Sequence, residues 1–189
     1  VLPANRQGDV ASNGQLHRCK VVWPFLPKNA DKIDDGFYIS GVGPASEPAK
    51  LKELGITHVL CVPQQCPQAY FPDQFEYLII GVDDFPTVNL RPHFRTCADF
   101  VKQGREAGGT CLRGLITRST GVLVHCMAGV SRASSMSIAY LMMHQGMPLR
   151  DAHAKVKAVR ECICPNAGFW TQLQEFEKEL VEERKKAQS

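Results

Sequence analysis

A cysteine and an arginine six residues apart could together carry out nucleophilic attack on a phosphate ester. Between His125 and Arg132 the chain reads His-Cys-Met-Ala-Gly-Val-Ser-Arg, so Cys126 follows the apolar run 121–124 and precedes the mostly apolar segment 133–143. The first run is typical of a short buried strand and the second of a helix. A cysteine on a tight strand-to-helix loop lies where unpaired backbone N–H groups converge, which is where an anionic group binds.

The expected helix N-terminus should also activate the nucleophile. Its unpaired N–H groups and the positive end of the helix dipole favour the thiolate form of Cys126, which is the reactive form. Gly129 lets the loop turn tightly against a ligand, and the planar guanidinium of Arg132 matches two phosphate oxygens at once. A buried structural cysteine beside a solvated arginine is the alternative, but strand, loop, glycine, arginine and helix follow in a consistent order. The loop residues expected to bind the phosphoryl oxygens through backbone N–H groups are Met127, Ala128, Gly129, Val130, Ser131 and Arg132.

The motif His-Cys-x-x-Gly-x-x-Arg at 125–132 resembles the signature of the cysteine-dependent protein tyrosine phosphatase superfamily. The segments 34–40 and 165–169, and the Ala-Tyr-Leu-Met-Met that follows the motif, are similar to its dual-specificity branch. The resemblance extends over residues 31–180, nearly all of the chain. It implies a protein phosphatase that acts on phosphotyrosine and on phosphoserine or phosphothreonine through a cysteinyl-phosphate intermediate, without a metal or another cofactor.

The mechanism that this resemblance implies also needs an acid to protonate the leaving oxygen. In the superfamily the acid is an aspartate on a loop upstream of the signature, and the spacing to Asn89 and Leu90 assigns that position to Asp84. Asp83 is the alternative, because the two carboxyl groups are adjacent. A third interpretation makes Asp84 a turn residue that caps the helix starting near Pro92.

One residue departs from the family pattern. Most members carry a serine or threonine after the arginine, whose hydroxyl donates a hydrogen bond to the cysteine sulfur, whereas this chain has Ala133. Without that donor the sulfur is a poorer leaving group, so we expect the intermediate to be hydrolysed slowly relative to its formation. Ser134 lies one position along the helix and should point elsewhere.

Three further residues are expected to support the site. His125 precedes the nucleophile and should orient the loop by hydrogen bonding, or serve as a core histidine with nearly the same effect. Asn166 should cap the final helix and brace the loop. Arg160 aligns with a family arginine that binds a second substrate phosphate, and an ordinary cation at a helix end is the other interpretation.

The loop and the overall charge narrow the substrate class. The variable positions 127, 128 and 130 hold no lysine, whereas phosphoinositide phosphatases of the superfamily typically place additional cations there. A net charge of +3 suits anionic phosphopeptides and does not indicate nucleic-acid binding. We therefore expect phosphorylated proteins as substrates and kinases of signalling cascades as candidate partners.

Two other functions stay open. Glucan phosphatases resemble this chain in the Ala-Gly and Arg-Ala of the loop, although they have glycine where it has Ser131. A phosphoprotein-binding scaffold with weak activity is the second alternative, since Ala133 leaves the efficiency of the chemistry open.

Strand and helix patterns alternate along the chain, which predicts an α/β fold with a central mixed, mostly parallel sheet flanked by helices. Strands are expected at 36–40, 56–62, 75–82 and 121–124. Helices are expected at 47–54 and 133–143, and two more should begin near residues 92 and 148. A last helix should bury Phe169, Leu173, Phe176 and Leu180.

The 189 residues divide into an N-terminal extension or arm at 1–30, a dual-specificity phosphatase catalytic domain at 31–181 and a charged C-terminal tail at 182–189. The stretch 104–120 is longer than its connection needs, so we expect a mobile loop or a short extra helix there. No apolar run approaches membrane-spanning length and none follows a basic leader, so we expect no contact with membranes.

The eight cysteines form no regular disulfide framework and no Cys-x-x-Cys pair. A catalytic thiolate works in a reducing compartment. We therefore expect a cytoplasmic location, a nuclear location or both.

Overall fold

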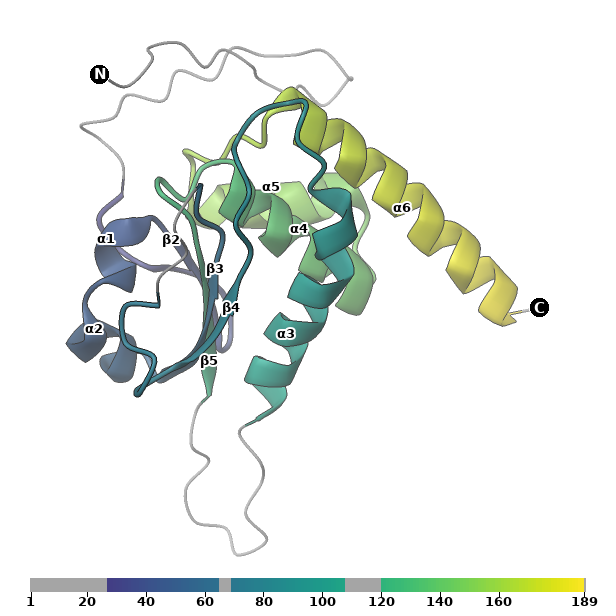
Figure 1. Cartoon of the computed structure of the whole chain (residues 1–189). Coiled ribbons are helices and arrows are strands. Elements are labelled where there is room, and N and C mark those ends of the chain that lie inside the picture. Colours follow the sequence, from purple (N-terminus) through teal and green to yellow (C-terminus); the bar gives the residue numbers. More distant parts are fainter. Residues whose placement is uncertain (1–26, 65–68, 108–119, 189) are drawn as a thin grey trace, which may run out of the picture.

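The computed structural model describes residues 27–64, 69–107 and 120–188, and a five-stranded sheet forms its centre (Figure 1). The strands lie in the order β1-β2-β5-β3-β4. Only β1 and β2 pair antiparallel, and the other neighbours pair parallel. The predicted mixed, mostly parallel sheet is therefore confirmed. The strands are β1 (Asp31–Asp34), β2 (Phe37–Ser40), β3 (Ile56–Cys61), β4 (Glu76–Ile79) and β5 (Gly121–His125).

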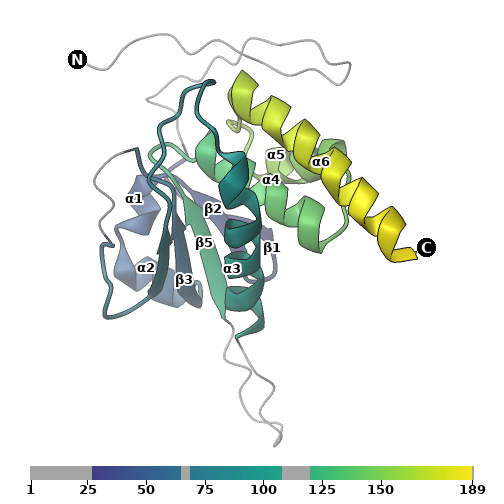
Figure 2. The same cartoon turned by 45° about the vertical axis from the view of Figure 1, so that its right-hand side comes forward.

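Helices cover both faces of the sheet (Figures 1 and 2). On one face lie α1 (Val42–Ala45) and α2 (Pro48–Glu53). On the other face lie α3 (Phe94–Glu106), α4 (Arg132–His144), α5 (Leu149–Val159) and α6 (Ala167–Gln188), with the short 3₁₀ helix η2 (Arg91–His93) leading into α3.

β5 is buried along its whole length, and its side chains alternate between the two faces. Val122 and Val124 belong to the large apolar cluster under α3 and α4. Leu123 joins a smaller cluster on the opposite face with Leu51 of α2 and Val59 of β3. A strand that has parallel neighbours and helices on both sides must be apolar on both faces, which explains the continuous apolar run in the sequence.

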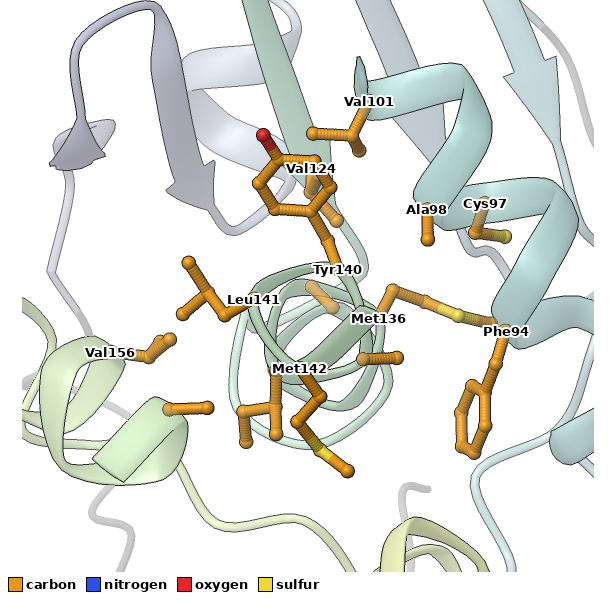
Figure 3. Packing of buried hydrophobic residues seen from close by; sticks show 14 of the residues in the cluster. Phe94, Cys97, Ala98, Val101, Val124, Met136, Tyr140, Leu141, Met142 and Val156 are labelled. Carbon is orange, nitrogen blue, oxygen red and sulfur yellow. The ribbon is translucent and has the colours of Figure 1, made fainter. Parts of the chain in front are cut away.

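α4 is the central helix of the larger layer. Its residues up to Met142 are all buried, and Figure 3 looks along its axis at side chains that point outward in several directions. Met136 points toward Phe94 of α3, and Leu141 points toward Val156 of α5. The helix that follows the signature loop is therefore anchored on nearly all sides, which fixes the position of its N-terminus.

The parallel strands β3, β4 and β5 end at the same edge of the sheet. Cys61 at the end of β3 is in register with His125 of β5 and with Ile79 of β4. Two hydrogen bonds extend the pairing beyond the strands, from the Val62 N–H to the His125 carbonyl and from the Ile80 N–H to the Cys61 carbonyl, each at 2.9 Å. Ligands of parallel α/β sheets bind at this edge, and both candidate catalytic loops start from it.

The structure differs from the sequence-based expectation in its shortest elements. Neither β1 nor α1 was predicted, because four residues carry too little periodic pattern. α3 continues to Glu106, so the start of the expected loop at 104–120 is helical, and residues 108–119 lie outside the described residues.

The predicted segments at the two chain ends are described only in part. Residues 1–26 of the predicted arm lie outside the described residues. Residues 182–188 of the predicted charged tail form the mostly exposed last turns of α6. Within the described ranges, no helix combines the length and the apolar character needed to cross a membrane.

Gly104 provides a test of how closely α3 packs on the sheet. A Cβ atom at this position would lie 2.5 Å from Val122 Cγ2 and 2.7 Å from the His58 ring. We expect Gly104→Ala to lower the free energy of unfolding by about 1–3 kcal/mol, although alanine normally stabilises a helix interior by about 1 kcal/mol relative to glycine. Urea unfolding measures the change.

Gly43→Ala is the matched control, since a Cβ at Gly43 would meet no atom within 4 Å. We expect its stability to stay within about 0.5 kcal/mol of the wild type. Equal stabilities for the two variants would contradict the proposed packing.

Candidate active site

The loop at 126–131 joins β5 to α4, and backbone hydrogen bonds hold it from two sides. We call it the cysteine loop. The Val42 N–H donates to the Met127 carbonyl at 3.0 Å, and the Cys164 N–H donates to the Val130 carbonyl at 2.8 Å. These contacts come from the start of α1 and from the connection between α5 and α6. The loop conformation is therefore set by the fold itself.

Gly129 gives the cysteine loop its turn. Its φ of +67° is in the left-handed region that favours glycine. A Cβ there would also lie 2.6 Å from the carbonyl carbon of Ser40. In this conformation the Gly129 N–H donates to Cys126 Sγ at 3.2 Å. The sequence predicted that backbone N–H groups would converge on the cysteine, and this bond is one such contact.

The residue after the arginine contributes no polar group to the sulfur. Ala133 is fully buried in the first turn of α4. The hydroxyl of Ser134 lies 2.6 Å from the Val130 carbonyl and 2.8 Å from the Ser131 carbonyl, so it bonds the backbone. The expectation that Ser134 points elsewhere is confirmed.

Arg132 lies between the cysteine loop and a second loop, residues 80–90, that connects β4 to η2. We call this second segment the acid loop. The guanidinium is buried, and its Nη1 donates to the Val82 carbonyl at 3.1 Å. Its Nε lies 3.6 Å from Asp84 Oδ2, close enough for an ion pair but without a hydrogen bond. The arginine therefore joins the two loops.

Asp84 is the acid-loop carboxyl that the structure brings to the cysteine loop. It is only 7% exposed. Its Oδ1 accepts hydrogen bonds from the Ser131 hydroxyl at 2.7 Å and from the Asn166 side-chain amide at 2.9 Å. By contrast, Oδ1 of Asp83 is buried and has no hydrogen-bond partner among the described residues. The geometry favours Asp84 over Asp83 as the candidate acid, and it does not make Asp84 a cap of the helix near Pro92.

Asn166 fulfils the predicted capping role and also reaches the site. Its side-chain oxygen accepts a hydrogen bond from the Phe169 N–H at 2.9 Å, which caps α6 and confirms the prediction. Its own backbone N–H donates to the Ser131 hydroxyl at 3.1 Å. Asn166 thus contacts both Ser131 and Asp84.

Arg160 follows the last residue of α5, and its side chain turns into the protein. Its side chain is 1% exposed. Nε donates to the Gly129 carbonyl and Nη2 to the Ala128 carbonyl, each at 2.9 Å, and Nη1 pairs with Asp31 at 2.6 Å. Arg160 is the C-cap residue of α5, so the predicted place at a helix end is confirmed. A guanidinium engaged on three sides inside the protein is no surface for a second substrate phosphate, so that interpretation is wrong, and the side chain braces the cysteine loop against β1.

His125 lies in the core directly before the cysteine loop. The ring is buried, and neither ring nitrogen has a hydrogen-bond partner within the part of the chain that the structure describes. Burial lowers the pKa of His125 to about 4, and the Cys126 backbone offsets only part of that shift. The alternative of a neutral core histidine describes the buried ring, and orientation of the loop through hydrogen bonding by His125 stays a prediction.

Three exposed apolar side chains lie on or beside these loops. Met127 of the cysteine loop is 56% exposed, and Phe85 of the acid loop is 51% exposed. Tyr70 is 44% exposed and has its ring centroid 6.3 Å from that of His125. We call these three residues the apolar rim. They are large apolar groups that a substrate would meet beside the buried catalytic candidates.

Two partners in the site were not identified from the sequence. Val82 binds Arg132 through its backbone carbonyl, so its side-chain type gives no signal. Asp31 lies 129 positions from Arg160, and no local pattern connects them. Within residues 27–64, 69–107 and 120–188, no three His, Cys, Asp or Glu side chains gather where they could hold a metal ion.

The arrangement combines the groups that phosphoryl transfer requires. It brings together a buried cysteine with an amide donor on its sulfur, a guanidinium, and a carboxyl group fixed beside that guanidinium. Such a reaction depends mainly on positioning and on stabilising charge on the transferred group. The buried and interlinked loops supply the positioning.

Comparison with known proteins agrees with this chemistry. The family model described as "Dual specificity phosphatase, catalytic domain" matches residues 37–179. Dual specificity protein phosphatase 1 of Arabidopsis thaliana is 38% identical over 148 residues, which cover 78% of this chain and 69% of that protein. MAP kinase phosphatase with leucine-rich repeats protein 1 of Dictyostelium discoideum is 37% identical over 150 residues, 79% of this chain but only 16% of that longer protein. The crystal structure of human DUSP28 superposes with a TM-score of 0.72 at 28% identity, covering 82% of this chain and 97% of that one.

The buried neutral state of His125 predicts how stability depends on pH. The folded pKa of about 4 lies below the ordinary value of 6.5, so the unfolded chain binds more protons between these pH values. Stability should fall as the pH drops from about 6.5 to about 4, with a contribution from His125 of about 3 kcal/mol. Chemical unfolding at a series of pH values measures this loss.

His125→Asn removes the titrating group and serves as the comparison. Between pH 6.5 and pH 4 the variant should lose about 3 kcal/mol less stability than the wild type. His153, whose pKa is also lowered by burial, is present in both proteins and does not contribute to the difference. Parallel stability curves for the two proteins would contradict the assignment.

Proposed function

The chain belongs to the dual specificity phosphatase family, and on that premise we propose that it hydrolyses phosphotyrosine and phosphoserine or phosphothreonine in proteins through a cysteinyl-phosphate on Cys126. Membership makes it a hydrolase of the protein phosphatase class. The observation that carries the mechanism is the hydrogen-bonded connection of the cysteine loop to Asp84, through Ser131 and beside Arg132.

In the first step the Cys126 thiolate attacks phosphorus and the bond from phosphorus to the leaving oxygen breaks. The guanidinium of Arg132 and the backbone N–H groups of the cysteine loop hold the three non-bridging oxygens. Asp84 donates a proton to the leaving oxygen. The hydrogen bonds that Oδ1 of Asp84 accepts from Ser131 and Asn166 hold the carboxyl group beside Arg132 for this transfer.

In the second step water attacks the phosphorus of the cysteinyl-phosphate. Asp84, now a carboxylate, accepts a proton from that water, the sulfur–phosphorus bond breaks and the thiolate is regenerated. Phosphate then leaves. The same carboxyl group therefore acts first as an acid and then as a base, and its fixed position beside the cysteine loop supports both uses.

Phosphorylated proteins are the substrates that we propose, with signalling kinases among them. Support comes from relatives named MAP kinase phosphatases and from the apolar rim, which suits peptide side chains next to a phosphate. The cysteine loop carries no lysine of the kind that multiply charged inositol phosphates require. A thiolate mechanism works in a reducing environment, so we place the protein in the cytoplasm, the nucleus or both.

Replacement of the nucleophile separates catalysis from binding. Cys126→Ser should lower turnover of p-nitrophenyl phosphate and of phosphopeptides by at least about a thousandfold, because a serine hydroxyl is a much weaker nucleophile than a thiolate and Asp84 acts as an acid in the step in which it would attack. Binding of the same phosphopeptides should persist, since the loop amides and Arg132 remain. Steady-state kinetics and calorimetry measure the two effects.

Cys162→Ser, at a half-buried cysteine outside the cysteine loop, is the control and should keep its activity. If the wild type shows only background turnover and binds phosphopeptides as tightly as Cys126→Ser does, the protein is a binding scaffold instead. Faster phosphate release from amylopectin than from phosphopeptides would identify a glucan phosphatase.

The alanine at position 133 predicts which of the two steps is slower. Without a hydroxyl donor on Sγ the thiolate is a poorer leaving group, so rapid-quench experiments on p-nitrophenyl phosphate should show a burst of nitrophenol followed by slower turnover. Ala133→Ser should reduce the burst and raise the steady-state rate by about threefold to tenfold. Linear release from the first turnover of the wild type would rule out slow hydrolysis of the intermediate.

A further inference from the structure

The acid loop has little structure of its own to hold Asp84 in place. Residues 80–90 form neither helix nor strand, and an internal hydrogen bond, from the Val88 N–H to the Phe85 carbonyl at 3.0 Å, closes a turn. Phe85, Pro86 and Thr87 at this turn are exposed. A loop of this kind needs external contacts to keep a side chain in one position.

The beginning of α6 supplies the first of these contacts through close packing. A Cβ atom on Gly168 would lie 2.6 Å from the carbonyl carbon of Pro86 and 2.7 Å from its Cα. Real Cβ atoms do not approach backbone atoms so closely, so any other residue at this position would push the acid loop away. Pro86 is two residues from Asp84.

The second contact is made one turn further along α6. The Gln172 side-chain oxygen accepts hydrogen bonds from the Leu90 N–H at 2.6 Å and from the Arg91 N–H at 2.9 Å. Its amide group donates to the Val88 carbonyl at 2.8 Å. One side chain thus satisfies three backbone groups at the end of the acid loop, and each of them would otherwise need another partner.

We propose that Gly168 and Gln172 are positioning residues that hold the acid loop so that Asp84 stays at the cysteine loop. The inference rests on the proposed function of Asp84 as general acid. Gly168 fixes the loop just after the acid and Gln172 fixes its far end, while Asn166 binds the carboxyl group itself. A displacement of about 1 Å is enough to lower a rate by about a hundredfold when the moved group takes part in the chemistry.

A purely structural role for the two residues predicts a different result. α6 also buries Phe169, Leu173, Phe176 and Leu180 in the core. If Gly168 and Gln172 served only this packing, their replacement would lower stability and would affect all substrates alike. A positioning role affects substrates according to how strongly each depends on the acid.

The test compares two aryl phosphates. Phenyl phosphate has a basic leaving oxygen that needs a proton, whereas p-nitrophenyl phosphate has a leaving group that departs without one. The quantity measured is the ratio of kcat/KM for phenyl phosphate to kcat/KM for p-nitrophenyl phosphate, because kcat/KM reports the step in which the leaving group departs. Thermal unfolding of every variant is measured alongside.

We expect Gln172→Met to lower this ratio by about threefold to tenfold and Gly168→Ala to lower it by about tenfold or more. Gln174→Met makes the same change at an exposed position of the same helix, and Gly81→Ala adds a Cβ in open space on the acid loop. Both controls should leave the ratio unchanged. Gln172→Met keeps the side-chain length. It therefore still tests the positioning role if Gly168→Ala does not fold.

Asp84→Asn is the reference that separates two kinds of failure. If Asp84→Asn lowers the ratio and Gln172→Met does not, the positioning inference is overturned while the proposed function stands. If Asp84→Asn lowers kcat/KM for both substrates equally, Asp84 is not the general acid and both proposals are overturned.

Discussion

The Ser131 hydroxyl joins the three segments on which the site depends. It donates a hydrogen bond to Asp84 of the acid loop and accepts one from the Asn166 N–H just before α6, while its own backbone belongs to the cysteine loop. A hydroxyl group has one proton to donate and can accept at the same time, so it can connect a carboxyl group to an amide in this way. The bond to Asp84 is buried and the bond from Asn166 is partly buried, where an unpaired polar group costs free energy, so the three segments are stabilised together.

The surrounding fold makes this connection rigid. α4 is buried around nearly its whole circumference (Figure 3), so the cysteine loop leaves β5 and enters α4 at two fixed points. The Arg160 guanidinium fills the space behind the loop and binds the Gly129 carbonyl from within the protein. Burying such a charge is costly unless it is paired and fully hydrogen-bonded, and the Asp31 carboxylate together with the loop carbonyls meets that condition. The Arg160 side chain therefore ties the catalytic loop to the edge of the sheet.

Local patterns explain which parts of this arrangement could be predicted. A buried strand, a glycine-containing turn and an apolar helix are encoded in consecutive residues, so the placement of Cys126 followed from the sequence, as did the cap formed by Asn166. The ion pair of Arg160 with Asp31 and the hydrogen bond of Gln172 to Val88 each join residues more than 80 positions apart, and both residue types suit an exposed helix surface equally well. Gly104 could not be explained from the sequence for the same reason. Its place in α3 depends on the side chains of β3 and β5 that it packs against, and not on helix propensity.

The side chains proposed to carry out the reaction are buried, and those that a substrate would contact beside them are exposed. Every side chain proposed to form or break a bond is buried, whereas the apolar rim of Met127, Phe85 and Tyr70 is about half exposed. Met127 and Phe85 are each adjacent in sequence to a proposed catalytic residue, so their side chains extend from a backbone that is already fixed. Changing such a side chain alters what the surface contacts without moving the sulfur or the carboxyl group. The rim therefore offers a substrate contacts that are separate from the proposed chemistry, and such a separation is how one fold can serve many substrates.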